Sequence, residues 1–189
     1  MIKLVVGLGN PGAEYEKTRH NAGFLFVDAL QAKYGGNWLF EDKFKGFVCR
    51  VQLGGSNIML LKPSLFMNRS GYSVSKLVGF YKILPEELLV VHDELDFDAG
   101  IVKLKTGGGH AGHNGLRDIM VSLSGNEFHR LRIGIGRPLS GKSVSNYVLS
   151  VPSMEGKIAI DNAIDGAISY VEQLVIADIE TVKNKINSL

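Results

Sequence analysis

The chain has a single cysteine, no long apolar run and little net charge, and the first two of these exclude whole classes of protein. Cys49 has no second cysteine to pair with, so an internal disulfide is impossible and a zinc site built from several thiolates is excluded. Because Cys49 lies in an apolar strand-like run, we expect a buried structural thiol. No apolar run is long enough to cross a bilayer. The sequence opens with a strand-like run rather than a targeting segment, so we expect a cytoplasmic protein.

The net charge is small but leaves a nucleic-acid partner possible. Lys and Arg number 21 against 19 Asp and Glu, which gives a formal charge of +2 and a pI near 8.6. Such a balance does not demonstrate nucleic-acid binding, because the clustering of basic residues matters more than their sum. The length of 189 residues favours one domain spanning residues 1–189.

Strand-like and helix-like segments alternate along the chain. Apolar residues recur at helical spacing within 24–30, 74–81 and 116–123, and again from Glu155 to Val175 and from Ile179 to Leu189. The predicted strands are Lys3–Leu8, Phe47–Gln52, Asn57–Lys62, Leu88–His92, Ile101–Lys105 and Leu131–Gly136. Gly54-Gly55-Ser56 predicts a hairpin between the second and third. The pattern predicts an α/β fold, a single-domain three-layer sandwich with a mixed, mostly parallel twisted sheet flanked by helices.

A glycine run near the N-terminus matches the dinucleotide-binding spacing G-x-G-x-x-G. Gly7-Leu8-Gly9-Asn10-Pro11-Gly12 follows an apolar strand, as that fingerprint requires. However, Pro11 precedes the third glycine, where a Rossmann unit continues into a helix. The acidic residue expected on the ribose would be Asp28, which lies in a helical pattern rather than at the end of a second strand. A dinucleotide-dependent oxidoreductase is therefore the least favoured function.

Polar residues follow several predicted strands and suggest one catalytic crevice. Asn10, Asn68 and Asp93 come at or after strand ends, and His20 and Asn114 lie on loops that enter helices. Open α/β sheets bind ligands beyond the carboxyl ends of their strands, so these side chains are expected to meet. A histidine with a carboxylate indicates a general base and its orienting partner. Amides position water and stabilise an oxyanion. No activated Ser or Cys is evident, which favours direct attack by water.

Each of these residues also has a purely structural interpretation. Asn10 and Asn114 fit turn and helix N-cap positions, as does Asn21 before the first helix. Asp93, beside other acidic residues, fits a solvated loop, and His20 fits an unpaired surface histidine. The spacing alone does not identify the reaction.

The glycine-rich stretch 107–115 allows two further interpretations. His110 and His113 suggest a metal site, but they lie in a loop rather than at i and i+4 of a helix, so no metal is favoured. Backbone N–H groups that enter a helix there would suit an anion such as a phosphate. A closely folded loop without a ligand fits the sequence equally well.

Taken together, several blocks carry a specific resemblance. They are Gly7-Leu8-Gly9-Asn10-Pro11-Gly12, Tyr15, Thr18-Arg19-His20-Asn21 with Gly23, Phe66-Met67-Asn68 with Ser70-Gly71, His92-Asp93-Glu94-Leu95-Asp96, His113-Asn114-Gly115-Leu116, and Arg130 through Pro138. In their order and spacing the chain resembles bacterial-type peptidyl-tRNA hydrolases over nearly its whole length. These enzymes hydrolyse the ester between a peptide and the terminal ribose of tRNA. The resemblance implies peptidyl-tRNA as the partner, through its acceptor end and peptide, and implies no metal or other cofactor and a monomer.

The resemblance also implies roles for individual residues. His20 is the general base, Asp93 stabilises its protonated form, and Asn10 distinguishes N-blocked peptidyl substrates from free aminoacyl-tRNA. Positions that match substrate or tRNA contacts are Tyr15, Phe66, Met67, Asn68, His113 and Asn114. A basic face for tRNA phosphates comprises Lys103, Lys105 and Arg132, and less securely Arg137 and Lys142.

Two positions depart from the family pattern. Leu65 stands where Thr is frequent, and Ala111 replaces a glycine common in the loop. Ala111 is unfavourable only if its φ is positive. The alternative function that remains is a non-catalytic tRNA-binding module, in which the same basic face holds RNA without cleavage.

Overall fold

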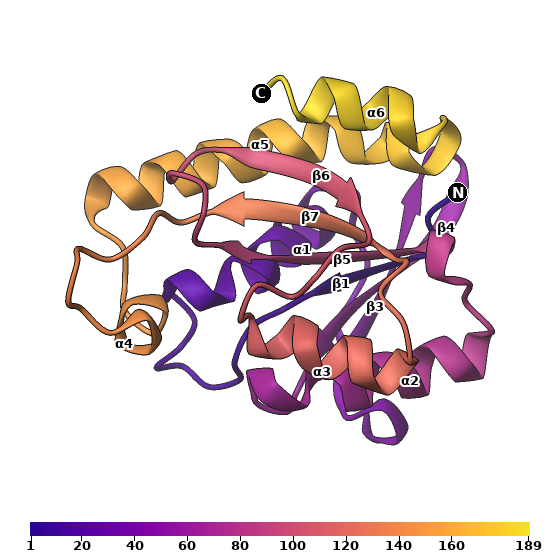
Figure 1. Cartoon of the computed structure of the whole chain (residues 1–189). Helices are drawn as coiled ribbons and strands as arrows, with labels where there is room; N and C mark the ends of the chain where they lie inside the picture. Colours follow the sequence, from indigo (N-terminus) through magenta and orange to yellow (C-terminus); the bar gives the residue numbers. More distant parts are fainter.

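A seven-stranded mixed sheet lies between two layers of helices in the computed structural model, which describes residues 1–189 (Figure 1). The strands are β1 (Leu4–Gly7), β2 (Leu39–Glu41), β3 (Gly46–Leu53), β4 (Ser56–Pro63), β5 (Leu88–Glu94), β6 (Val102–Thr106) and β7 (His129–Gly134). Their order is β2-β3-β4-β1-β5-β7-β6. The four strands β4, β1, β5 and β7 run parallel, while β2, β3 and β6 pair antiparallel with their neighbours. The expected mixed α/β sheet is confirmed.

Helices cover both faces of the sheet. The helices are α1 (Ala22–Tyr34), α2 (Ser70–Tyr81), α3 (Asn114–Leu123), α4 (Val144–Val148), α5 (Met154–Ile176) and α6 (Ile179–Ile186). α1, α5 and α6 pack on one face, and α2 and α3 on the other (Figure 1). In β5, Leu89 and Val91 join the first core, whereas Leu88 and Val90 join the second. A strand buried on both faces explains why β5 is an almost continuous apolar run.

Two elements were not predicted. β2 has three residues with an exposed or half-exposed pattern, and α4 has five, so neither is long enough to establish a period. One strand is also displaced from its predicted position: β7 spans His129–Gly134, whereas the sequence predicted Leu131–Gly136. The predicted hairpin is confirmed between β3 and β4, where Gly54 and Gly55 take φ of 53° and 78°. Positive φ at both central residues is what a tight hairpin requires.

The glycine run packs a helix on a strand. A Cβ on Gly7 would lie 2.3 Å from the carbonyl oxygen of Gly23, and one on Gly23 would lie 2.3 Å from both the Leu8 nitrogen and the Val91 oxygen. α1 therefore rests directly on the backbone of β1 and β5. Gly12 lies in a turn well before α1, and Asp28 lies in α1, where it accepts from Lys62 Nζ at 2.6 Å. Neither residue matches its role in the dinucleotide fingerprint.

The structure bears on two expectations from the sequence, a buried structural thiol at Cys49 and the lack of a segment that could cross a bilayer. Cys49 is 1% exposed, and burial raises the pKa of its thiol, as expected for a structural cysteine. No helix has both the length and the hydropathy that a membrane span needs.

Candidate active site

Residues at or just after the carboxyl ends of the parallel strands line one cleft of about 570 Å³. Asn10 follows β1, Met67 and Asn68 lie in a short 3-10 helix, η3 (Met67–Arg69), after β4, and Asp93 is the penultimate residue of β5. β1 lies between β4 and β5. The strands that come next in the chain, β2 to β4, lie on one side of β1, and the later strands β5 to β7 lie on its other side, so the cleft opens where the strand order reverses. This is the topological switch point at which open α/β sheets bind ligands. The predicted convergence of these residues is observed.

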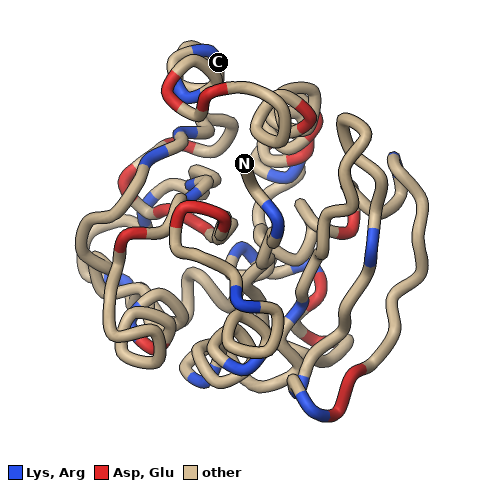
Figure 2. Tube along the Cα trace, turned by 90° about the vertical axis from the view of Figure 1, so that its right-hand side faces the viewer, with Lys and Arg blue, Asp and Glu red and all other residues tan.

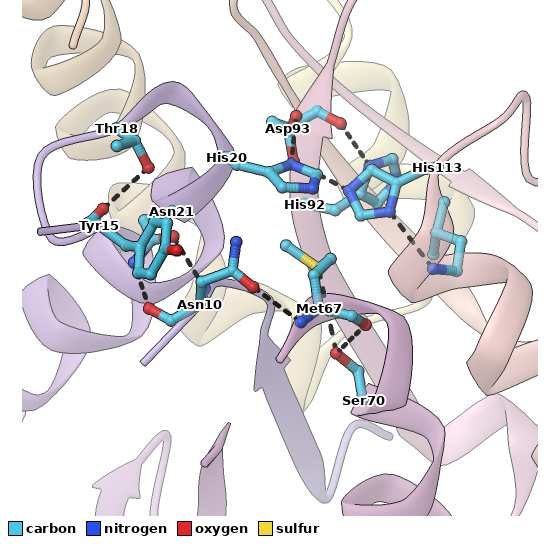
Figure 3. Close-up of polar contacts among 11 residues, drawn as sticks. Asn10, Tyr15, Thr18, His20, Asn21, Met67, Ser70, His92, Asp93 and His113 are labelled. Atoms are coloured by element: carbon cyan, nitrogen blue, oxygen red, sulfur yellow. Dashed lines mark hydrogen bonds and ion pairs between the residues drawn. The ribbon is translucent and has the colours of Figure 1, made fainter. Parts of the chain in front are cut away.

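His20 and Asp93 form a buried pair. His20 lies in the 3-10 helix η1 (Arg19–Asn21), directly before α1, and its Nδ1 is 2.9 and 3.0 Å from the two carboxylate oxygens of Asp93 (Figure 3). Burial by itself would raise the pKa of Asp93, but the facing imidazoles of His20 and His113 outweigh burial and hold that pKa below its usual range. Asp93 is therefore a carboxylate, and His20 Nδ1–H donates to it.

His113 holds the same carboxylate from the other side. Its Nε2 is 2.9 Å from Asp93 Oδ1, and its Nδ1 accepts from the backbone N–H of Leu116 at 3.3 Å. A backbone N–H only donates, so the proton of neutral His113 is on Nε2 and points to Asp93. With both imidazoles donating to Asp93, the Nε2 lone pair of His20 is left free. His113 lines the cleft as expected, but its side chain is engaged with Asp93 and the start of α3.

His92 completes the histidine cluster. It is 2% exposed, donates from Nδ1 to the backbone oxygen of Asp93 at 2.7 Å, and lies edge-on to His113 with ring centroids 5.1 Å apart. Burial, with a contribution from His113, lowers the pKa of His92 to about 3. His92 is therefore neutral, and its Nε2 has no hydrogen-bond partner.

The amide of Asn10 is oriented by two backbone segments. Asn21 accepts from the Asn10 backbone N–H and donates to its carbonyl, both at 2.9 Å, and Asn10 Oδ1 accepts from the Met67 N–H at 2.8 Å (Figure 3). The acceptor side of the amide is thus occupied, which leaves Nδ2 as a donor in the cleft. Asn21 occupies the N-cap position of α1, as predicted, but its side chain makes no cap bond. For Asn114 the helix-cap interpretation is wrong, because His113 is the N-cap of α3.

Aromatic and amide side chains form the exposed rim. Phe66 is 56% exposed and meets Tyr15 edge to face, with ring centroids 6.2 Å apart. Asn68 and Asn114 are exposed and line the cleft. Tyr15 does not line the cleft itself but supports Phe66, which does.

A basic wall closes the cleft on the side of β6 and β7. Lys105 and Arg132 line it, with Arg137, which pairs with Asp96. Lys103 lies outside the lining, because its amine donates to the backbone oxygen of Asn187 after α6. Lys142 is exposed and also lies outside the lining.

The histidines of the glycine loop do not form the pair that a metal would need. His110 Nδ1 accepts from the Gly112 N–H, whereas His113 turns to Asp93. The group with metal-like spacing is instead His20, Asp93 and His113, whose ligand atoms lie within 4.8 Å of one another. Both imidazoles hold protons on the nitrogens that face the carboxylate, so a cation there would have to displace two hydrogen bonds.

Two parts of the cleft were missed from the sequence. α4 contributes an apolar wall of Val144 and Val148, and it is held to η1 by Arg19, whose guanidinium lies 4.0 Å from the Tyr147 ring centroid and donates to Ser150 Oγ at 2.6 Å. Arg130 is the other omission. The predicted strand began only at Leu131, so Arg130 was given no role, and its burial is explained by the loop carbonyls that it contacts.

Comparisons with known proteins agree with this geometry. The family model described as peptidyl-tRNA hydrolase matches residues 4–189. The peptidyl-tRNA hydrolase of Methylococcus capsulatus is 50% identical over 187 residues, covering 99% of this chain and all of that protein. That of Acinetobacter baumannii strain AYE is 52% identical, covering 99% and 96%. A crystal structure of peptidyl-tRNA hydrolase from A. baumannii superposes with a TM-score of 0.96 at 50% identity, covering 99% and 95% of the two chains. The chain therefore belongs to the peptidyl-tRNA hydrolase family.

Proposed function

We propose that the protein hydrolyses the ester of N-blocked aminoacyl-tRNA and peptidyl-tRNA, releasing the peptide and free tRNA for reuse in translation. The observation that carries this proposal is the free Nε2 of His20, which faces the cleft while Nδ1 is committed to Asp93. Family membership supplies the substrate class. We propose a monomer, as the sequence resemblance implies, and translation in the cytoplasm is the setting that this substrate requires.

The reaction needs one base and no covalent intermediate. His20 Nε2 takes a proton from water as the water oxygen attacks the ester carbonyl carbon. Asp93 stays ionised and stabilises the imidazolium. The tetrahedral intermediate then collapses, the carbon–oxygen bond to the ribose breaks, and the imidazolium returns its proton to the ribose oxygen. Asn68 and Asn114 offer amide donors for the developing oxyanion.

Asn10 provides a basis for selecting N-blocked substrates. Its Nδ2 is a donor, because Met67 N–H already occupies Oδ1. A peptide carbonyl next to the scissile residue accepts such a donor, whereas the ammonium of a free aminoacyl group has no acceptor and places a positive charge against it. We therefore assign Asn10 to recognition of the peptide.

The rim and the basic wall suit the RNA end of the substrate. Phe66, supported by Tyr15, offers a face for an unpaired terminal base. Lys105 and Arg132 line the cleft from β6 and β7 and offer charge to phosphates, and Lys103 lies opposite Arg132 in the ladder of the same two strands. Both signs of charge are interspersed along the chain in Figure 2, so the local wall rather than the net charge supports tRNA binding.

The deciding experiment compares N-acetylated and free aminoacyl-tRNA as substrates of the purified protein, with and without a chelator. We expect turnover of the blocked substrate only, unaffected by the chelator.

His20→Ala should lower kcat by roughly 100- to 10,000-fold, and Asp93→Asn should lower kcat with tRNA binding unchanged. Asn10→Asp should alter the ratio of blocked to unblocked turnover. Salt-dependent tRNA binding without peptide release at saturating enzyme would instead identify a non-catalytic binding module.

A further inference from the structure

Arg130 is the most deeply buried cation of the chain and has no acidic partner. Its side chain comes from β7, the residue is 2% exposed, and no carboxylate lies within ion-pair distance. The charges that act on it are Arg132, of the same sign, and Glu94, which makes no ion pair with it. A buried guanidinium without a counter-ion is costly unless its donors are well used. The contacts that use them are therefore the key to its role.

Those contacts are carbonyl groups of the glycine loop. Arg130 Nη1 donates to the Gly109 oxygen at 2.9 Å, and Nη2 donates to the Gly107 oxygen. The intervening Gly108 oxygen accepts from Asn126 Nδ2 at 3.3 Å. Three consecutive carbonyls are thus held by side chains, two of them by one planar guanidinium. Lysine has a single charged nitrogen and cannot reproduce this fork.

The loop needs external support because its backbone is unusual. Gly107, Gly108, Ala111 and Gly112 all have positive φ, from 48° to 87°. A Cβ on Gly108 would lie 2.9 Å from Arg130 Nη2, so backbone and guanidinium are in close contact. Segments in such conformations persist only when their surroundings fix them.

The loop ends at the residue that holds Asp93. His113 follows Gly112 directly, and its Nε2 must stay within 2.9 Å of the carboxylate for Asp93 to receive two imidazole protons. We propose that Arg130 is a positioning residue: by clamping the carbonyls of Gly107 and Gly109 it sets His113 on Asp93 and so keeps His20 Nε2 free as the base. This role rests on the proposed function of His20.

The same contacts argue against Arg130 as a phosphate ligand. Both Nη groups are engaged by the loop, and the remaining Nε is buried without a partner. Arg130, Lys105 and Arg132 all line the cleft, but Lys105 and Arg132 are only partly buried, whereas Arg130 is 2% exposed. Loss of Arg130 should therefore affect the chemical step rather than tRNA affinity.

The test compares Arg130→Met with Arg117→Met, in which the replaced residue is an exposed α3 arginine whose side chain makes no hydrogen bond or ion pair. We expect Arg130→Met to lower kcat about 10- to 100-fold, with KM for N-acetylated aminoacyl-tRNA and its salt dependence within about twofold, because one oriented contact of a catalytic base is lost. When His113 no longer donates to Asp93, the carboxylate interacts more strongly with protonated His20, so the acid limb of kcat/KM should move to higher pH. Arg117→Met should change neither quantity.

A second variant and a spectroscopic readout cover the case in which Arg130→Met does not fold. Asn126→Ala removes only the exposed hold on Gly108 and should move the acid limb in the same direction by a smaller amount. In ¹⁵N-histidine spectra, the His113 Nε2–H signal should be sharp in the native protein and lost or broadened in either variant. This readout needs no turnover, so it tests the clamp even if the ester is not the substrate. Unchanged histidine spectra and kcat, with a raised KM and a weaker salt dependence, would overturn the proposal and make Arg130 a tRNA contact.

Discussion

Ala111 is a strained residue that lines the cleft but contributes no catalytic group. Its φ of 48° places an alanine in the left-handed region, at a loop position where the sequence resemblance leads us to expect glycine. That conformation costs an L-residue about 1–2 kcal/mol. Replacing the alanine by glycine removes this strain, but part of the stabilisation is lost because glycine has more conformational freedom in the unfolded chain. Leu65, the other departure, does not line the cleft, and nothing in the structure explains it.

We predict that Ala111→Gly stabilises the protein by about 0.5–1 kcal/mol without loss of activity. The measurement is the urea midpoint together with the thermal midpoint. Ala13→Gly is the matched control, because Ala13 lies in an exposed turn without positive φ and its replacement should be neutral or destabilising. Equal shifts in the two variants would contradict the strain argument.

Single residues were also where sequence reasoning was least complete. Positions of His20, Asn10 and Asp93 at strand and helix ends followed from the order of elements. The engagement of His113 with Asp93 did not, because the two lie 20 residues apart on different elements. Arg130 was missed because the predicted strand began at Leu131, and because the loop carbonyls that hold its guanidinium inside are brought to it only by folding.

At the level of elements, the contact between α1 and β1 depends on glycine in both partners. Backbone atoms of Leu8 and Val91 occupy the space that a Cβ on Gly23 would need, at 2.3 Å. Backbone cannot move aside as a flexible side chain can. α1 also follows η1, so its seating determines where His20 stands.

We predict that Gly23→Ala destabilises the protein by about 3 kcal/mol or more, in the range of severe overpacking, or prevents folding. Gly79→Ala is the matched control, because Gly79 lies in α2 with no heavy atom within 4 Å of its ideal Cβ. That change should stabilise by about 0.5–1 kcal/mol through helix propensity. Chemical denaturation of both variants measures the difference, and a Gly23→Ala protein as stable as the native one would refute the close packing.

The elements that sequence predicted were those with a clear period or a buried apolar run. β1, β4 and β5 are of this kind, as are α2 and α3. β2 and α4 were missed because each is shorter than two full periods and partly exposed, so tertiary contacts such as Arg19 with Tyr147 define them. The fold class was therefore predictable, while the apolar wall of the cleft was not.

At the scale of the whole molecule, the neutral buried His92 links stability to pH. Its pKa is about 3 when folded against an ordinary 6.5, so the unfolded chain binds a proton more readily below pH 6.5. Stability is therefore fully present above pH 6.5 and is lost as pH falls toward 3, by at most ~1.4 kcal/mol per pH unit from this residue. The pKa of His129 is also lowered by burial and acts in the same direction.

We predict that His92→Asn lowers the thermal midpoint at pH 8 but makes it fall less steeply between pH 6.5 and 4.5. Thermal denaturation across this range, beside the native protein, measures the slope. His110→Asn serves as the control, since His110 is only partly buried and should leave the slope unchanged. A His92→Asn slope as steep as the native one would remove His92 as a source of acid sensitivity.

The basic wall gives a second property of the whole molecule, the salt dependence of substrate binding. If Lys105 contacts one phosphate, Lys105→Gln should raise KM at low salt and reduce the slope of log KM against log salt concentration by about 1. Lys183→Gln, on α6 and paired with Glu180, is the control and should leave that slope intact. An unchanged slope for Lys105→Gln would place the phosphates elsewhere.

The reciprocal bonds between Asn10 and Asn21 have a practical consequence. They close the base of the segment 11–20 much as a pair of strands would, while Gly12, Ala13 and Glu14 at its tip are exposed. Changes at the tip are thereby insulated from the Asn10 amide, to which we assign recognition of the peptide. A cysteine introduced at residue 13 could carry a fluorophore, since Cys49 is buried and unreactive, and would turn the enzyme into an optical reporter of tRNA arrival.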